Sequence, residues 1–338
     1  MALLDWLYPK IFIAIVEVNE RRYNVVLRSS FRGSEQEEQR KTFTSFASLD
    51  EYIATLKSES PYYYVALLNP ARDQGALPTC SKVAMREFSD IALLQSVCVE
   101  NRWSVFSSSA EIKESMHKYD DFGLDYLYSP FLILHRVFGD KIGDERVTMF
   151  VLIQEQSVAV AIFRADDLKF AFYGITDEDE VALFAEEDAL QEDLSLDEEL
   201  FEEDMDDSLD LEDLDGLDDI GSLDEIETLD DIEEIESFEE LDDVIEEDIE
   251  TQEQKSDSLE NYNIDYYRFT LIQDALKIFY GDKRYDQAFV EALFIADSAE
   301  CSADLRNYLE EELFMQPIIR RIDLGEELMA LMLDEVNR

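Results

Sequence analysis

Few residues of this sequence have the types and spacing that enzyme chemistry requires. The only histidines are His117 and His135, and no serine or cysteine stands at a recognisable spacing from a His/Asp pair, so nucleophilic catalysis has no candidate. His135 falls in an apolar run, which is typical of a packed histidine rather than a base. Neither a P-loop nor a GxGxxG turn is present. We therefore expect no catalytic residue and no enzyme activity.

The cysteines and acidic residues indicate no metal site. Cys80, Cys98 and Cys301 are far apart and form no CxxC motif. We expect neither a disulfide framework nor a structural zinc site, and a reducing cytosol is the simplest setting for three such cysteines. Pairs such as Asp177 and Asp179 are so common that they indicate only diffuse counterion binding. No metal ion and no other cofactor is therefore expected.

The charge of the chain argues against two classes of partner. Its 338 residues, enough for about two domains, include 28 Lys+Arg and 82 Asp+Glu, a formal charge of −54. Phosphate binding needs a basic stripe, so we expect no nucleic-acid partner and no docking to an anionic membrane by charge. No clean run of about 18 apolar residues occurs, so no direct membrane insertion is expected. The first ten residues lack the basic start of a secretory signal.

Most of the negative charge lies in one segment. Residues 177–250 contain 39 Asp+Glu and no Lys or Arg, whereas the other 264 residues hold 43 acids against 28 bases. Apolar residues from Leu211 to Val244 recur at every third position, a period that fits neither a helical stripe nor a strand. Repulsion between the carboxylates also opposes compaction. We expect a solvated, disordered insert; the alternative is a string of acidic–hydrophobic docking motifs for a basic partner.

Strands and helices alternate on both sides of this segment, which predicts the α/β class with at least one mixed sheet in each half. Ser48, Ser129 and Ser302 are expected as helix N-caps, and residues 73–78 as a loop. The expected strands or extended segments span 11–18, 23–29, 40–46, 62–68, 94–99, 103–107, 146–153, 157–164, 168–174, 289–295 and 315–322, and the expected helices span 48–57, 111–119, 130–138, 266–279, 302–313 and 324–336.

Three stretches of the chain resemble one known family. The first is an opening hairpin, IFIAIVEVNERRYNVVLRSS at 11–30. The second is an apolar helix, YSPFLILHRVFG at 128–139, followed by a β-meander, RVTMFVLIQEQSVAVAIFRADDLKFAFYGIT at 146–176. The third comprises DYYRFTLIQDALKIFYG at 265–281, AFVEALFIADSAECSADLRNYLEEEL at 288–313 and DLGEELMALMLDEV at 323–336. In pattern and order they resemble the actin-like PilM / GspL cytoplasmic-domain family of type IV pilus, type II secretion and competence machineries.

The resemblance implies an actin-like (ribonuclease H-like) two-lobed α/β fold with a long disordered acidic insert. Residues 1–176 would form lobe I and the start of lobe II, and residues 263–338 would form the remainder of lobe II. Residues 177–262 would be the acidic insert, at the place where relatives carry a small helical subdomain. GspL relatives continue into a transmembrane helix, whereas this sequence stops at Arg338, so the PilM-like arrangement is the expected one.

The resemblance also implies a degenerate nucleotide site. ATP-binding members use two D-x-G turns and a Gly-Gly pair, because glycine lets the backbone approach the phosphates and the nucleoside. Glu20 and Glu155 would add negative charge beside the phosphates, so we predict that no nucleotide binds. The matching positions, which all lack the glycines, are Glu17, Asn19 and Glu20 in the first turn, Gln154, Glu155 and Gln156 in the second, and Ala296 and Asp297 after the late strand.

In function, the resemblance implies a non-catalytic cytoplasmic scaffold, peripheral to the inner membrane, of a pilus, secretion or DNA-uptake machine. Its partners would be the PilN-like tail of an inner-membrane assembly protein and an assembly or secretion ATPase, with a basic protein on the acidic insert. Tyr62, Tyr63 and Tyr64 could line a groove for the tail or fill alternate core positions of a strand. Two alternatives stay open: an ATP-binding member of the family, and an acidic mimic or chaperone for basic proteins.

Overall fold

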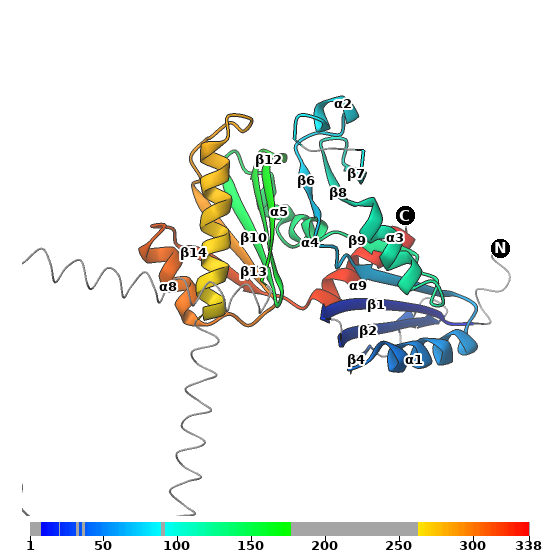
Figure 1. Ribbon diagram of the computed structural model, residues 1–338. Coiled ribbons are helices and arrows are strands. Elements are labelled where there is room, and N and C mark those ends of the chain that lie inside the picture. Colours follow the sequence, from blue (N-terminus) through cyan, green and yellow to red (C-terminus); the bar gives the residue numbers. More distant parts are fainter. Residues whose placement is uncertain are drawn as a thin grey trace, which may run out of the picture. The chain divides into compact units, whose positions relative to one another are not determined.

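The computed structural model describes residues 8–19, 21–31, 34–35, 38–88, 92–176 and 263–337 (Figure 1). Glu20 and the acidic segment at 177–262 lie outside the described residues, and so do the expectations that concern them. The described strands form three sheets.

The first sheet begins with the predicted hairpin. β1 pairs antiparallel with β2, from Lys10 opposite Ser30 to Asn19 opposite Arg22, and parallel with β5, which in turn pairs parallel with β9. Both faces of β1 are buried, because Ile13 packs in one hydrophobic cluster and Ala14 in another. The strand order is β3-β2-β1-β5-β9, with β4 also on β2; the strands are β1 Lys10–Asn19, β2 Arg22–Phe31, β3 Ser34–Glu35, β4 Gln39–Phe43, β5 Tyr63–Leu68 and β9 Tyr126–Tyr128.

The second sheet repeats this pattern. An antiparallel meander of three strands is followed by a fourth strand, which pairs parallel with the first strand of the meander, and by a fifth, which pairs parallel with the fourth. The order β12-β11-β10-β13-β14 therefore matches that of the first sheet, and the predicted α/β class is confirmed. The strands are β10 Thr148–Gln154, β11 Ser157–Arg164, β12 Asp167–Ile175, β13 Ala292–Asp297 and β14 Pro317–Arg321.

Helices cover both sheets. α1 buries its apolar residues against the Ile13 face of β1, and α9 packs on the opposite face of the same sheet. The helical residues 263–281, drawn in yellow in Figure 1, and α8 pack in the cluster on the second sheet. The helices are α1 Phe46–Glu59, α2 Lys82–Met85, α3 Ser109–Lys118, α4 Pro130–Val137, α5 Gly139–Ile142, α8 Ala303–Glu311 and α9 Leu324–Val336.

Two of the three predicted N-caps are confirmed. The Ser129 hydroxyl accepts from the Phe131 N–H, and the Ser302 hydroxyl from the Asp304 N–H. The prediction of Ser48 is wrong: α1 begins one turn earlier, and Ser45 accepts from the Ser48 N–H. The reason is that Phe46 joins the aromatic cluster with Tyr119, so tertiary packing extends the helix beyond its first local signal.

A third, smaller sheet corrects two expectations. Its order is β6-β8-β7, from β6 Gln74–Leu77, β8 Trp103–Ser108 and β7 Leu94–Val99, so residues 73–78, predicted as a loop, contain a strand. β6 is a strand because it pairs with β8 about 30 residues downstream, a pairing that its sequence, with Gly75 inside the strand and Pro78 directly after it, does not signal.

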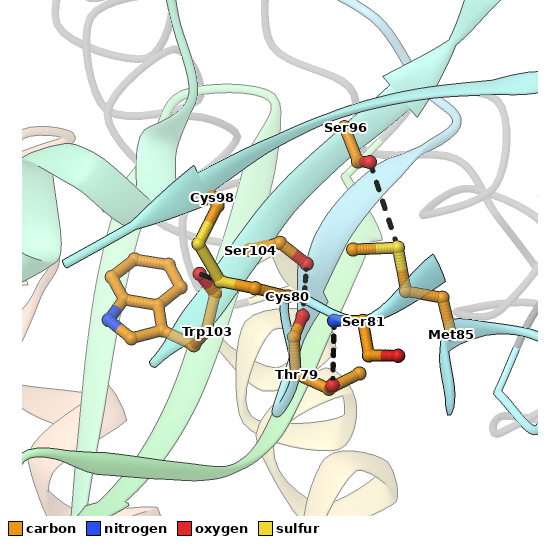
Figure 2. Close-up of a disulfide and its surroundings, with 8 residues drawn as sticks. All are labelled: Thr79, Cys80, Ser81, Met85, Ser96, Cys98, Trp103 and Ser104. Carbon is orange, nitrogen blue, oxygen red and sulfur yellow. Dashed lines mark hydrogen bonds between the residues drawn. A yellow bond between two sulfur atoms is a disulfide. The ribbon is translucent and has the colours of Figure 1, made fainter. Parts of the chain in front are cut away.

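The second correction concerns the cysteines. Cys80 and Cys98 form a disulfide with a Cα–Cα distance of 5.3 Å, so the expectation of unpaired cysteines is wrong (Figure 2). Their separation in sequence, 18 residues, is closed because Cys80 follows β6 and Cys98 lies in β7, and both strands pair with β8.

No described helix is both long enough and apolar enough to cross a membrane.

Candidate functional site

The turns that the resemblance equates with nucleotide loops come to the ends of neighbouring strands. In the second sheet, Ile153 of β10 stands opposite Asp297 of β13, so the turn at 154–156 and the end of β13 lie at one edge. The Ser298 N–H and hydroxyl both donate to the Ile153 carbonyl, at 3.0 and 2.8 Å. The second of these turns and the end of the late strand therefore lie next to each other, at the ends of two paired strands.

Glu17 does not lie in the first turn. It is a residue of β1 opposite Tyr23, and a bulge separates it from Asn19. Its side chain is 11% exposed, and both carboxylate oxygens are occupied: Lys118 Nζ donates to Oε1 at 2.5 Å, and the Tyr119 hydroxyl donates to Oε2 at 2.8 Å. The expected turn at 17–20 is thus corrected to a shorter one after Asn19, and the charge of Glu17 is neutralised by α3.

This contact perturbs both of its donors. Burial alone would lower the pKa of Lys118, but the hydrogen bond and charge of Glu17 outweigh it and raise that pKa. The pKa of Tyr119 is also raised, first by burial and then by the negative charge of Glu17. Both shifts hold the donors in the protonated form that binds Glu17.

An ion pair joins the first and second turns. Arg22 begins β2 immediately after the first turn, and its Nη2 contacts Oε2 of Glu155 in the second turn. Asn19 closes the first turn by accepting the Arg21 N–H at 3.0 Å. The Glu155 carboxylate, expected to repel phosphates, therefore faces a guanidinium of the same chain. Both side chains are about two-fifths exposed, so the pair adds little stability, about 0–1 kcal/mol.

The second turn is also tied down through its backbone and side chains. Gln154 Nε2 donates to the Ser157 hydroxyl at 2.9 Å, and the Gln156 carbonyl accepts the Thr176 N–H at 2.9 Å. The Glu155 carbonyl accepts the Thr176 hydroxyl at 3.0 Å and Nη2 of Arg268 at 3.5 Å.

A buried polar cluster lies behind this turn. Asp297 caps the loop after β13 by accepting the N–H groups of Ala299 and Cys301, at 3.0 and 3.2 Å. Asp265 accepts Nη1 of Arg268 at 2.8 Å and the Ser302 N–H at 2.7 Å. Asp265, Arg268 and Asp297 are each at most 6% exposed. Ala296, the remaining predicted position, is fully buried in β13.

Sequence reasoning missed Arg268, Asp265, Lys118 and Arg22. The first two are the only members with a local signal, since opposite charges three residues apart interrupt an apolar helical pattern. That signal was hidden because acidic residues are so frequent in this chain.

The remaining candidates have structural environments. His135 packs its ring 5.6 Å from that of Trp103, as a packed histidine does, whereas His117 is exposed on α3. Tyr64 stacks on Phe12 at 5.4 Å, and Tyr63 packs in the cluster beneath α1. Within the described residues, no group of three His, Cys, Asp or Glu side chains could hold a metal ion.

Comparisons with known proteins give the following matches. The profile of a family described as domain of unknown function (DUF8341) matches residues 149–337, and that of a second, domain of unknown function (DUF8569), matches residues 8–135. No curated protein gives a significant sequence match.

Among the solved structures that match at low sequence identity are the following three. A PilM-PilN type IV pilus biogenesis complex matches at a TM-score of 0.47 and 11% identity, over 95% of this chain and 94% of that chain. A Bacteroides thetaiotaomicron protein with an actin-like ATPase fold and unknown function matches at 0.32 and 10%, over 54% and 77%. The cytoplasmic domain of EpsL, an inner membrane component of the type II secretion system of Vibrio cholerae, matches at 0.29 and 8%, over 49% and 71%.

Proposed function

This chain belongs to the family of the domain of unknown function DUF8341, and we propose that it is a non-catalytic, actin-like scaffold of the PilM / GspL type. It would serve a type IV pilus, type II secretion or DNA-uptake machine at the cytoplasmic side of the inner membrane. There it would bind the cytoplasmic tail of an inner-membrane assembly protein and link that protein to an assembly ATPase.

This proposal rests on the charged groups at and beside the turns, which are already paired with other residues of the same chain. Glu17 is bound by Lys118 and Tyr119, Glu155 by Arg22, and the Glu155 carbonyl by Arg268. A triphosphate would have to displace these contacts and would then meet the freed carboxylates of Glu17 and Glu155. The repeated sheet order supports the actin-like part of the proposal. The two sheets have matching strand orders, while the turns between their strands make contacts within the chain.

The proposed tail would bind as an extended segment. Among the described residues, β9 and β14 each have a strand neighbour on one side only, so an added strand could pair with either edge through backbone hydrogen bonds. Such binding needs no catalytic residue, and its affinity would come from backbone pairing together with the side-chain pockets beside the edge.

Titration calorimetry with MgATP tests the loss of nucleotide binding. We expect no binding heat for the full chain at concentrations that would reveal a Kd of about 100 μM or tighter. Micromolar binding would contradict the proposal and favour the ATP-binding alternative. Arg22→Ala is the matched variant, because it removes the ion pair with Glu155. If MgATP binds only to this variant, the ion pair is what prevents nucleotide binding.

Binding of membrane-protein tails tests the scaffold. The probes are fluorescent peptides copied from the cytoplasmic tails of inner-membrane proteins encoded beside this gene, measured by anisotropy. We expect one peptide to bind equally well to the full chain and to a variant with residues 179–262 replaced by a short Gly/Ser linker. If binding instead needs residues 179–262 and extends to unrelated basic proteins, the acidic chaperone alternative holds.

A further inference from the structure

The Cys80–Cys98 disulfide lies on the surface of the third sheet. Cys98 is an exposed residue of the edge strand β7, and Cys80 is half-buried in the connection between β6 and α2. Figure 2 shows the bond beside the indole of Trp103, which is itself 1% exposed. Of the two bonded residues, Cys98 is therefore the one that lies at the protein surface.

Few side-chain contacts hold α2 and β7 themselves, whereas the residue Glu87 just after α2 is held by Arg284, which donates to its carbonyl at 3.0 Å. In β7, the side chains of residues 95–98 are exposed, so the strand is attached through its ladder of hydrogen bonds to β8 and not through burial. α2 has four residues and buries only Met85. The Ser96 hydroxyl lies 3.7 Å from Sδ of Met85, and the Ser104 hydroxyl donates to the Thr79 carbonyl at 2.7 Å (Figure 2).

We propose that Cys80 and Cys98 form a thiol–disulfide exchange site for a dithiol reductant, and that their redox state sets how firmly α2 and β7 are held on the third sheet. The proposal goes beyond the scaffold function and does not depend on it. An accessible disulfide between weakly attached elements differs from a structural one, which is shielded and resists reduction.

The exchange is balanced in thiols and electrons. A thiolate of the reductant attacks Sγ of Cys98, the residue at the surface, forms a mixed disulfide with it and releases Cys80 as a thiolate, which takes up a proton. The second thiol of the reductant then attacks the mixed disulfide and releases Cys98 as a thiol. The protein gains two electrons and two protons, and the dithiol becomes a disulfide.

The neighbourhood of Cys80 stabilises its reduced and protonated form. Its Sγ lies 3.1 Å from the Trp103 carbonyl oxygen, which cannot bind the oxidised sulfur but can accept a hydrogen bond from the S–H of the reduced residue. The third cysteine, Cys301, is of a different kind: burial raises the pKa of its thiol, so little reactive thiolate forms there.

Differential alkylation of the native, full-length chain tests the exchange. The protein is oxidised with glutathione disulfide, treated or not with dithiothreitol, and then alkylated with N-ethylmaleimide for peptide mass spectrometry. We expect Cys80 and Cys98 to be joined before reduction and both alkylated after it, without denaturant, while Cys301 reacts only in urea. The absence of the bond after oxidation, or its reduction only in urea, would overturn the proposal.

Limited trypsin cleavage tests the effect on α2 and β7. Lys82 and Arg86 are exposed at the two ends of α2, and we expect cleavage there to be roughly tenfold faster or more after reduction, because the cross-link no longer restricts local opening. Cys98→Ser should behave like the reduced protein under all conditions, whereas the control Cys301→Ser should still respond to dithiothreitol. Cleavage at the exposed Lys277 should not change. Equal rates at Lys82 and Arg86 in both redox states would refute the proposal.

Discussion

At the scale of single residues, Glu17 shows how a carboxylate beside the hairpin turn becomes part of the protein's own structure. Lys118, the last residue of α3, and Tyr119 directly after it bind its two oxygens, across 101 and 102 residues of sequence. The position of Glu17 near a turn could be predicted from the hairpin pattern. Its partners could not, because a contact between residues so far apart leaves no local period in the sequence.

The same contact predicts a loss of stability at alkaline pH. The pKa of Lys118 is raised above 10.5 and that of Tyr119 above 10.0 in the folded protein. At a pH between the pKa of each group in the unfolded chain and its higher pKa in the folded protein, the unfolded chain has lost a proton that the folded protein keeps. The free energy of unfolding therefore falls as the pH rises through this range. Below pH 10 the contribution is fully present. Urea unfolding from pH 8 to 11 should show this fall.

Glu17→Gln is the control for that titration. It removes the charge that favours protonated Lys118 and Tyr119, so the decrease above pH 10 should become shallower. At pH 8 the variant should lose about 1–3 kcal/mol, because Lys118 is left partly buried without its anion. An unchanged alkaline slope in Glu17→Gln would show that this contact does not control the titration.

A second residue-scale prediction compares two ion pairs on one helix. Arg268–Asp265 and Lys277–Asp274 are both three residues apart within 263–281, but the side chains of the first are 8% and 3% exposed, and those of the second 63% and 46%. Arg268→Met should cost about 3–5 kcal/mol, because it leaves Asp265 buried without its cation. Lys277→Met should cost less than about 0.5 kcal/mol. Thermal unfolding measures both, and similar costs would contradict the assigned burial.

At the scale of elements, α9 approaches the first sheet through a glycine. A Cβ added at Gly325 would stand 2.5 Å from Cγ2 of Val26, which is buried in β2. Gly325→Ala should therefore destabilise the protein by about 1–3 kcal/mol, although alanine is intrinsically the better helix former. Gly139→Ala is the matched control, since a Cβ there has no neighbour within 4 Å, and it should be neutral or stabilising. Equal effects would mean that α9 and β2 are less closely packed.

Long, periodic elements were predictable and short ones were not. The β-meander and α9 appear where their apolar patterns placed them, because burial selects the same residues that the pattern marks. β6, with four residues, and the three-residue β9 gain their strand conformation from pairing with distant strands. For the same reason the Cys80–Cys98 bond was missed, since it depends on β6 and β7 sharing β8 as a neighbour.

At the scale of the whole molecule, the two described segments that flank residues 177–262 meet at the Glu155 turn. The Thr176 hydroxyl and Arg268 Nη2 both donate to the Glu155 carbonyl. We predict that replacing residues 179–262 with about ten Gly/Ser residues preserves the fold and raises the free energy of unfolding by about 1–2 kcal/mol, because each halving of loop length gains about 0.6 kcal/mol. Circular dichroism and urea unfolding measure this. A loss of cooperative unfolding would show that the segment is needed for the core.

The contact between α9 and β1 has a consequence for synthesis of the protein. Leu328, Met329 and Met332 complete the cluster that contains Phe12 and Ala14, more than 300 residues earlier in the sequence. A ribosome adding about 5–20 residues per second needs roughly 15 to 60 s to travel from β1 to the end of α9. During that interval one face of the nascent first sheet lacks the cover that α9 provides, so we expect the newly made chain to expose apolar surface until α9 has been translated.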